Sequence, residues 1–213
     1  MMMYDEKTIA QAVQKALQQL QEEKTEITIG VSQRHVHLSQ QDLETLFGKG
    51  FQLTKQKTLM GREYASEQFV TLVGPSLRSI EKVRVLGPVR KHTQVEISRT
   101  DTFVLKVSPP VRPSGEIEGS ERLVLVGPKG TVYLKQGVII ANRHIHLSPA
   151  FAQKHGIADN DRVDVLVEGI KPTKFFDVQV RVRDDFREEM HIDTDDANSA
   201  GLRNGDQVRI IRQ

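Results

Sequence analysis

The chain of 213 residues is 38% hydrophobic and 27% charged with a formal net charge of +2, a composition typical of a globular protein with one large or two small domains. The small charge and the 5% aromatic content argue against a nucleic-acid partner, and the absence of cysteine excludes disulfides and leaves nitrogen and oxygen as metal ligands. No apolar run approaches the ~18–20 residues of a membrane span and no secretory signal is evident, so we expect no membrane association and a protein that acts inside the cell.

The first predicted element is a helix over residues 5–23, a segment rich in Ala, Gln, Glu, Lys and Leu that contains neither Gly nor Pro. Asp5 can cap its first turn. An apolar stripe runs along the helix and is formed by Ile9, Val13, Leu17 and Leu20. The helix either packs on its own domain or acts as a detachable amphipathic peptide that docks in a groove of a partner.

Short alternating segments bounded by Gly and Pro dominate the rest of the chain. The expected strands are residues 26–31, 51–57, 69–73, 82–86, 93–97, 103–107, 123–126, 131–134, 138–147 and 176–182. Short helices are expected at residues 41–47 and 149–155, and a loop or short hairpin at residues 61–68. Gly87-Pro88 is expected to end the strand before it. This pattern predicts a β-barrel or sandwich rather than a Rossmann sheet.

Two matching stretches stand out at residues 31–39 and 140–148, because both contain Arg-His-(Val/Ile)-His-Leu-Ser after an amide residue. They lie 109 residues apart and contain four of the seven histidines. Residues i and i+2 of a strand point to the same face, so each His-x-His offers two imidazoles side by side. Paired imidazoles of this kind are a good start for a metal site.

A second alignment supplies a third ligand for each pair. Residues 95–101 align with residues 190–196 at an offset of 95, which places Glu96 opposite His191. Both residue types bind zinc, and three protein ligands are the open pattern of catalytic rather than structural zinc. The two expected sites are His35, His37 and Glu96, and His144, His146 and His191.

Together these motifs resemble one family. The two Arg-His-x-His-Leu-Ser stretches, Leu-Gly-Pro-Val-Arg at residues 86–90 and Met-His-Ile-Asp-Thr-Asp at residues 190–195 are similar to those of the PduL-type phosphotransacylases, which are zinc-dependent phosphate acyltransferases. The resemblance implies a mainly β fold with two tandem six-stranded β-barrels, short capping helices and a dinuclear metal site between the barrels. The implied units are an N-terminal helix at residues 1–23, one barrel of residues 24–33 and 142–213, and a second barrel of residues 34–141.

The resemblance also assigns roles to residues. His35, His37 and Glu96 match one zinc site of the family, and His144, His146 and His191 match the other. Arg90 matches an arginine that binds phosphate. Ser32 and Ala141 match residues that line the substrate pocket, and Phe103 is expected to touch the CoA moiety.

The implied reaction converts acyl-CoA, either propanoyl-CoA or acetyl-CoA, and phosphate into acyl phosphate and free CoA. We expect two Zn²⁺ ions, although nitrogen and oxygen ligands also admit cobalt, nickel or iron. The Glu96 site is expected to hold the CoA sulfur, while the other site and Arg90 position phosphate. Phosphate then attacks directly, without an acyl-enzyme.

Short N-terminal extensions in this family target the enzyme to bacterial microcompartments, such as those of propanediol degradation. Residues 5–23 are therefore expected to bind shell proteins and to place the protein in the lumen; without that targeting it would be cytoplasmic. The expected assembly is a homodimer. Two other functions stay open: a non-catalytic, metal-dependent double-barrel binding protein, and a hydrolytic di-zinc enzyme.

Overall fold

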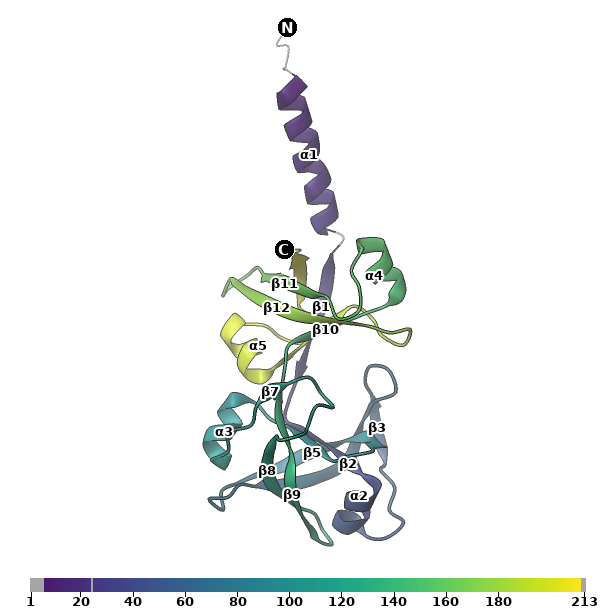
Figure 1. The fold of residues 1–213 in the computed structure, drawn as a ribbon, viewed down its shortest axis with the longest axis vertical. Coiled ribbons are helices and arrows are strands. Elements are labelled where there is room, and N and C mark those ends of the chain that lie inside the picture. Colours follow the sequence, from purple (N-terminus) through teal and green to yellow (C-terminus); the bar gives the residue numbers. More distant parts are fainter. Residues whose placement is uncertain (1–5, 24, 212–213) are drawn as a thin grey trace.

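The structure, a computed structural model, describes residues 6–23 and 25–211. It is mainly β, with two closed six-stranded barrels that lie one after the other along the long axis of the molecule (Figure 1). The double-barrel fold predicted from the sequence is thus confirmed. Asp5, the expected cap of the first helix, lies outside the described residues.

The first barrel combines one strand from the start of the chain with five from its end. Around the barrel these are β1 (Glu26–Ser32), β13 (Glu189–Asp193), β10 (His144–Leu147), β12 (Thr173–Val182), β11 (Arg162–Val167) and β14 (Gln207–Ile211), which closes on β1. Two short helices accompany this barrel, α4 (Pro149–His155) and α5 (Thr194–Ala200).

The second barrel is built from the middle of the chain. Around the barrel its strands are β4 (Tyr64–Val73), β5 (Ser79–Arg90), β2 (His35–Ser39), β6 (Gln94–Glu96), β9 (Thr131–Ala141) and β8 (Glu121–Val126), which closes on β4. Strand β3 (Lys55–Thr58) extends β4 as a hairpin, β7 (Val111–Arg112) pairs with the end of β9, and the helices are α2 (Gln40–Phe47) and α3 (Arg99–Leu105). From these strand sets we propose domain bounds at residues 24–33 with 142–213 and at residues 34–141.

The chain crosses between the barrels twice, and each crossing leads directly into a His-x-His strand. The first crossing joins the end of β1 at Ser32 to the start of β2 at His35. The second joins the end of β9 at Ala141 to the start of β10 at His144. Both histidine pairs therefore lie where the two barrels meet.

Strand alternation turns the histidines out of the barrel interiors. Val36 and Leu38 lie in the core of the second barrel, and Ile145 and Leu147 lie in the core of the first. All four are fully buried, so the alternate positions of the same strands point to the outer face. The serine that ends each motif then caps a helix: Ser39 Oγ accepts from the Asp42 amide at 3.1 Å, and Ser148 Oγ accepts from the Phe151 amide at 3.3 Å.

The expected strand at residues 103–107 is wrong, because this segment belongs to helix α3. Ser98 Oγ accepts from the Asp101 amide at 3.3 Å and the Asp101 carboxylate accepts from the Ser98 amide at 3.1 Å, which is a complete capping box. The apolar and β-branched residues after it favoured a strand, but the cap starts a helix that buries Leu105.

Other boundaries also differ from the sequence prediction. The strands expected at residues 131–134 and 138–147 are instead the long β9 (Thr131–Ala141) and the short β10 (His144–Leu147). Strand β5 does not end at Gly87-Pro88 but continues to Arg90, since Ser39 of β2 still pairs with Arg90 beyond a bulge. Strand β4 already begins at Tyr64, inside the expected loop, because its first residues pair with both β3 and β5. The strand expected at residues 51–57 is confined to Lys55–Thr58.

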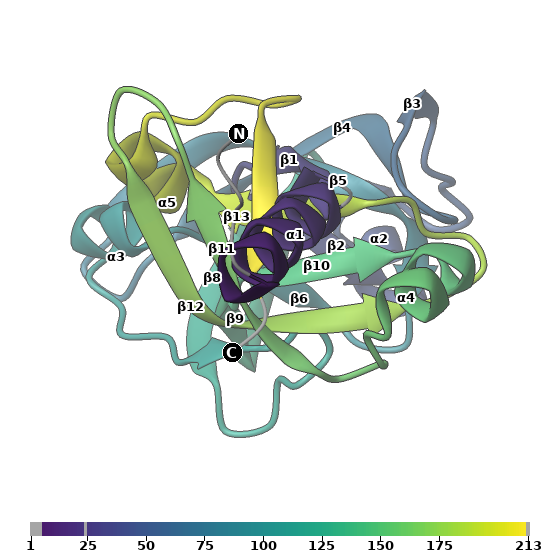
Figure 2. The same cartoon turned by 90° about the horizontal axis from the view of Figure 1, so that it is seen from above.

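Helix α1 (Glu6–Glu23) projects from the end of the first barrel (Figures 1 and 2). The side chains of Ile9, Val13 and Leu17 are each more than half exposed, so none of the residues that the structure describes covers this part of the apolar stripe. None of the helices among the described residues is long and apolar enough to cross a membrane.

Candidate metal centre

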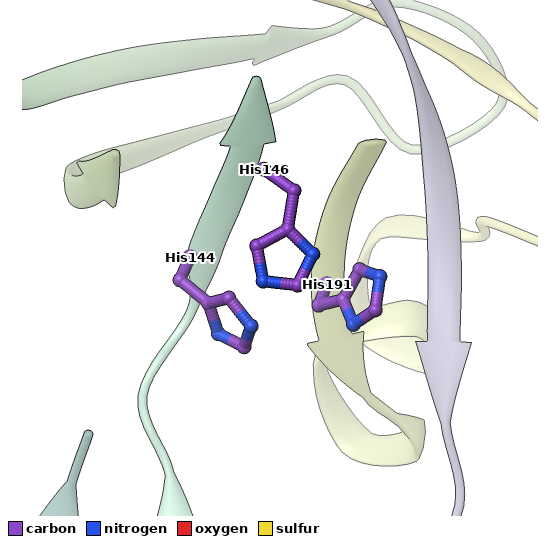
Figure 3. Close-up of side chains that lie close together, drawn as sticks. All are labelled: His144, His146 and His191. Atoms are coloured by element: carbon purple, nitrogen blue, oxygen red, sulfur yellow. The ribbon is translucent and has the colours of Figure 1, made fainter. Parts of the chain in front are cut away.

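The structure brings both expected ligand triads together. Within each triad the candidate ligand atoms of the three side chains all lie within 4.8 Å of one another. Figure 3 shows His144 and His146 on β10 turned toward His191 on the neighbouring strand. The members are His144, His146 and His191 in the first barrel and His35, His37 and Glu96 in the second.

Strand register explains why the repeat alignment found the third ligand. Strands β10 and β13 are antiparallel and pair His144 with His191. Strands β2 and β6 are antiparallel as well and pair His35 with Glu96. Directly opposed residues of an antiparallel pair point to the same face, so each third ligand lies beside its His-x-His pair.

Backbone carbonyls orient the first histidine of each motif. The Nδ1 atom of His35 lies 2.8 Å from the Gln33 carbonyl oxygen, and that of His144 lies 2.9 Å from the Asn142 carbonyl oxygen. A proton on Nδ1 leaves Nε2 as the ligand atom in both rings. In agreement with this, His35 Nε2 faces Glu96 Oε2 at 3.4 Å.

Glu96 and His191, the third candidate ligand of each triad, each have a hydrogen-bond partner two residues earlier on the same strand. Gln94 Nε2 donates to Glu96 Oε1 at 2.6 Å, while Glu189 Oε1 lies 2.8 Å from His191 Nε2. Gln94 thus orients the Glu96 carboxylate as a donor, and Glu189 orients the His191 imidazole as an acceptor. Residues that hydrogen-bond to metal ligands commonly fix the orientation of those ligands in this way. Extending the alignment at an offset of 95 by one position, to Gln94 and Glu189, would have found this pair.

Most of these side chains prefer the protonation state that suits a metal. His35 differs: burial acts to lower its pKa, but the neighbouring Glu96 carboxylate outweighs it and the pKa is raised. Burial, with His191 acting in the same direction, lowers the pKa of His144 to about 4 and that of His146 to about 2. Burial acts to raise the pKa of Glu96, but the neighbouring His35 outweighs it and the pKa is lowered. Neutral imidazoles and an ionised carboxylate are the forms that bind zinc.

One buried nitrogen offers a direct test of whether a metal fits. The Nδ1 atom of His37 is buried and has no hydrogen-bond partner among the residues that the structure describes. An unsatisfied buried polar atom costs about 1–3 kcal/mol, and such atoms are rare in folded proteins. The second triad therefore fits a metal ion, which would supply a partner for this nitrogen.

Arg90 joins this centre through Ser114. Its Nη1 donates to Ser114 Oγ at 3.1 Å, and Ser114 Oγ in turn donates to Glu96 Oε1 at 2.8 Å. The other terminal nitrogen, Nη2, lies 2.5 Å from Glu63 Oε1. A short polar path thus links the expected phosphate-binding arginine to a candidate metal ligand.

The hairpin between β3 and β4 reaches across to the first barrel. The Met60 sulfur at its tip lies 2.9 Å from Nδ1 of His146. On its other side His146 stacks on Phe186, with ring centroids 4.0 Å apart. No local pattern in the sequence points to Met60, Glu63 or Ser114, because their roles arise only when the barrels meet.

The three expected pocket residues are placed differently from one another. Ala141 lines a groove of about 670 Å³, together with Asn142 and with Arg99, Arg112, Arg143, Arg162 and Phe176. Ser32 ends β1 and pairs with Asp193, which also lines this groove. Phe103 is 62% exposed on α3 under the Arg99 guanidinium, and it is outside the set of groove-lining residues.

Comparison with known proteins shows one consistent similarity. A family model described as phosphate propanoyltransferase matches residues 28–203. A phosphate propanoyltransferase of Thermotoga maritima is 53% identical over 187 residues, which cover 87% of this chain and 89% of the relative. Proteins of the same description are 51% identical in Lachnoclostridium phytofermentans, over 95% of this chain and 96% of the relative, and 44% identical in Rhodopseudomonas palustris, over 88% and 83%.

Proposed function

Because the chain belongs to the phosphate propanoyltransferase family, whose members are acyltransferases, we propose that it interconverts acyl-CoA and phosphate with acyl phosphate and CoA. The names of the family and of the relatives support propanoyl-CoA as the acyl donor, with acetyl-CoA as the smaller alternative. The observation that carries the proposal is the link from Arg90 through Ser114 to Glu96, because it joins an anion-binding cation to a candidate metal site.

We propose two Zn²⁺ ions per chain, one in each triad, with cobalt, nickel or iron as chemically admissible substitutes. Zinc in these positions would polarise a thioester carbonyl and stabilise a thiolate. The protein fixes the orientation of the ligands through Gln94, Glu189 and the two backbone carbonyls.

Arg90 is the proposed phosphate ligand. Its side chain is 29% exposed, so the guanidinium is accessible at the edge of the centre. A planar guanidinium binds two oxygens of a phosphate at once, and Ser114 holds Nη1 in place beforehand. Glu63 forms an ion pair with this arginine.

The groove that contains Ala141 is the proposed site of the CoA moiety. Four aspartates line the groove beside the four arginines, and Arg143 and Arg162 are each ion-paired with one of them. Arg99 and Arg112 are therefore the proposed partners of the CoA phosphates, and Phe176, which is 62% exposed, offers a ring face. Asn142, which also lines the groove, lies two residues before His144 in the sequence. We propose that the Glu96 site would hold the CoA sulfur, while the other site and Arg90 position phosphate. Ser32 and Phe103 are proposed contacts at its edges.

Direct attack is the proposed mechanism. A phosphate oxygen forms a bond to the thioester carbonyl carbon, the carbon–sulfur bond breaks, and the electron pair leaves with the CoA thiolate. The chain contains no cysteine, and Ser114, which lies against Glu96, has its hydroxyl committed to that carboxylate. Both substrates then bind together, with no acyl-enzyme.

The test is a thiol-release assay on the purified protein with propanoyl-CoA. Release that depends on phosphate and stops after treatment with a chelator supports the proposal. Release without phosphate would indicate the hydrolytic di-zinc enzyme, and no release would indicate the non-catalytic binding protein. Isolation of a covalent acyl-protein would exclude direct attack.

We also propose that residues 5–23 bind a shell protein and place the enzyme in a bacterial microcompartment, such as one for propanediol degradation. The support is the exposed apolar stripe of α1, which suits docking in a groove of a partner. The homodimer stays a prediction, which light scattering of the full chain tests.

A further inference from the structure

Arg181 on β12 lies directly beside the first histidine pair. Strands β10 and β12 are parallel, and their register pairs His144 with Gln179 and His146 with Arg181. The alternate residues Val178 and Val180 are buried in the core of the first barrel. Gln179 and Arg181 therefore point outward, on the same face of the sheet as the two histidines.

These two outward side chains differ in their partners. Gln179 accepts from Asn142 Nδ2 at 3.0 Å and donates to Asn160 Oδ1 at 3.0 Å, so its amide is fully engaged. The guanidinium of Arg181 makes neither a hydrogen bond nor an ion pair with any residue among 6–23 and 25–211, although it is half-buried. A half-buried cation without a partner is costly, and an anionic ligand would relieve that cost.

Charges from both barrels act on Arg181, which places it at the boundary between them. Burial lowers the pKa of this guanidinium, and Arg90 acts in the same direction, against Glu96, Glu116 and Asp159. Glu96, Glu116 and Arg90 all belong to the second barrel side of the centre. Arg181, which lies beside His146, is therefore near enough to the second barrel for the charges of Glu96 and Arg90 to act on it, and it remains ionised.

The internal repeat shows that this arginine is specific to one half. The 95-residue offset that matches Glu96 with His191 also matches Leu86 with Arg181, and Leu86 pairs with His37 in the same way that Arg181 pairs with His146. The same offset matches Arg90 with Asp185. Each barrel thus contributes one arginine to the centre, and the two come from different positions of the repeat.

We propose that Arg181 is a second phosphate-binding residue, contributed by the first barrel, which binds oxygens of phosphate and of acyl phosphate from the side opposite Arg90. This inference rests on the proposed phosphate acyltransferase function. Arg90 forms an ion pair with Glu63, whereas Arg181 has no partner among the described residues. A bound phosphate would supply the anion that pairs with Arg181. Arginines on two sides also orient the attacking oxygen better than one arginine alone.

The test compares the steady-state kinetics of the full-length zinc-loaded enzyme with those of Arg181→Gln and Arg181→Lys. We expect the KM for phosphate to rise about 10- to 100-fold in Arg181→Gln, the loss typical of a charge-assisted hydrogen bond, and to rise less in Arg181→Lys, which keeps the charge but not the planar fork. The KM for propanoyl-CoA and the zinc content should stay within about twofold. In the reverse reaction the KM for acyl phosphate should rise in parallel.

The matched control is Arg209→Gln, which removes one arginine of the same barrel whose partner is Glu168 on the outer side of the fold. It should leave both KM values unchanged. The inference is overturned if the KM for propanoyl-CoA rises in place of that for phosphate, if neither changes, or if Arg181→Gln and Arg181→Lys both lose zinc in proportion to activity. A wild-type enzyme without phosphate-dependent thiol release would instead refute the proposed function itself.

Discussion

The guanidinium of Arg34 binds the carboxylate of Asp101 through two nitrogens, with Nε at 2.9 Å and Nη2 at 2.8 Å from Oδ1. The second half repeats this pair, since Arg143 Nε donates to Asp196 Oδ2 at 2.8 Å. In both halves the arginine precedes the His-x-His pair and the aspartate lies five residues after the third candidate ligand. Each pair therefore ties the two segments that hold one triad.

The two pairs differ in burial, which predicts unequal effects on stability. The Asp101 side chain is 4% exposed and also caps α3, whereas that of Asp196 is 22% exposed and caps nothing. Asp101→Ala should lower the free energy of unfolding by about 2–3 kcal/mol, through the lost cap and the lost charged hydrogen bonds. Asp196→Ala, the matched variant, should cost about 1 kcal/mol or less. Urea denaturation measures both, and equal losses would contradict this account.

Metal content should follow the triads one by one. Glu96→Gln and His191→Ala should each reduce the zinc measured by elemental analysis from two ions to one per chain, since each removes one of three ligands. Activity should fall by more than about 100-fold in both, because even outer partners of a metal cost 10–100-fold. His92→Ala, at an exposed histidine outside both triads, should keep both ions and full activity. Two ions retained in His191→Ala would remove His191 from the centre.

Ser114 should matter for phosphate more than for stability. Ser114→Ala removes the hydrogen bonds that connect Arg90 to Glu96, so the KM for phosphate should rise about tenfold when zinc is saturating. The KM for propanoyl-CoA should change little. Ser76→Ala, at an exposed turn, is the control and should behave as wild type. An unchanged KM for phosphate would show that Arg90 needs no such support.

Removal of the N-terminal helix should leave catalysis intact. Helix α1 projects from the first barrel and contributes nothing to either triad, so deletion of residues 1–23 should keep kcat/KM within about twofold. The same residues fused to a fluorescent protein should be packaged in cells that produce shells. Replacing the exposed Ile9, Val13 and Leu17 by serine in that fusion should abolish packaging. Diffuse fluorescence from the unmodified fusion would argue against a targeting role.

Strand patterns in the sequence were sufficient for a β-barrel or sandwich and the repeat alignment for the composition of both candidate triads, whereas the double barrel followed from the family resemblance. Residue alternation in a strand has a period of two, so a His-x-His pair must share a face whatever the rest of the chain does. The repeat alignment then placed Glu96 and His191 each beside its histidine pair, because β2 pairs with β6 in the same register as β10 pairs with β13. Local patterns failed at residues 103–107, where the capping box of Ser98 and Asp101 overrode the strand preference of the residues that follow.

Only the tertiary structure decided how the two halves meet. The Met60 tip next to His146, the link from Arg90 through Ser114 to Glu96 and the unpartnered Arg181 all depend on contacts between residues far apart in the chain. Such contacts are set by the packing of one barrel on the other, which has no period along the sequence. Strand alternation therefore determined the ligands, and barrel packing determined which charges surround them.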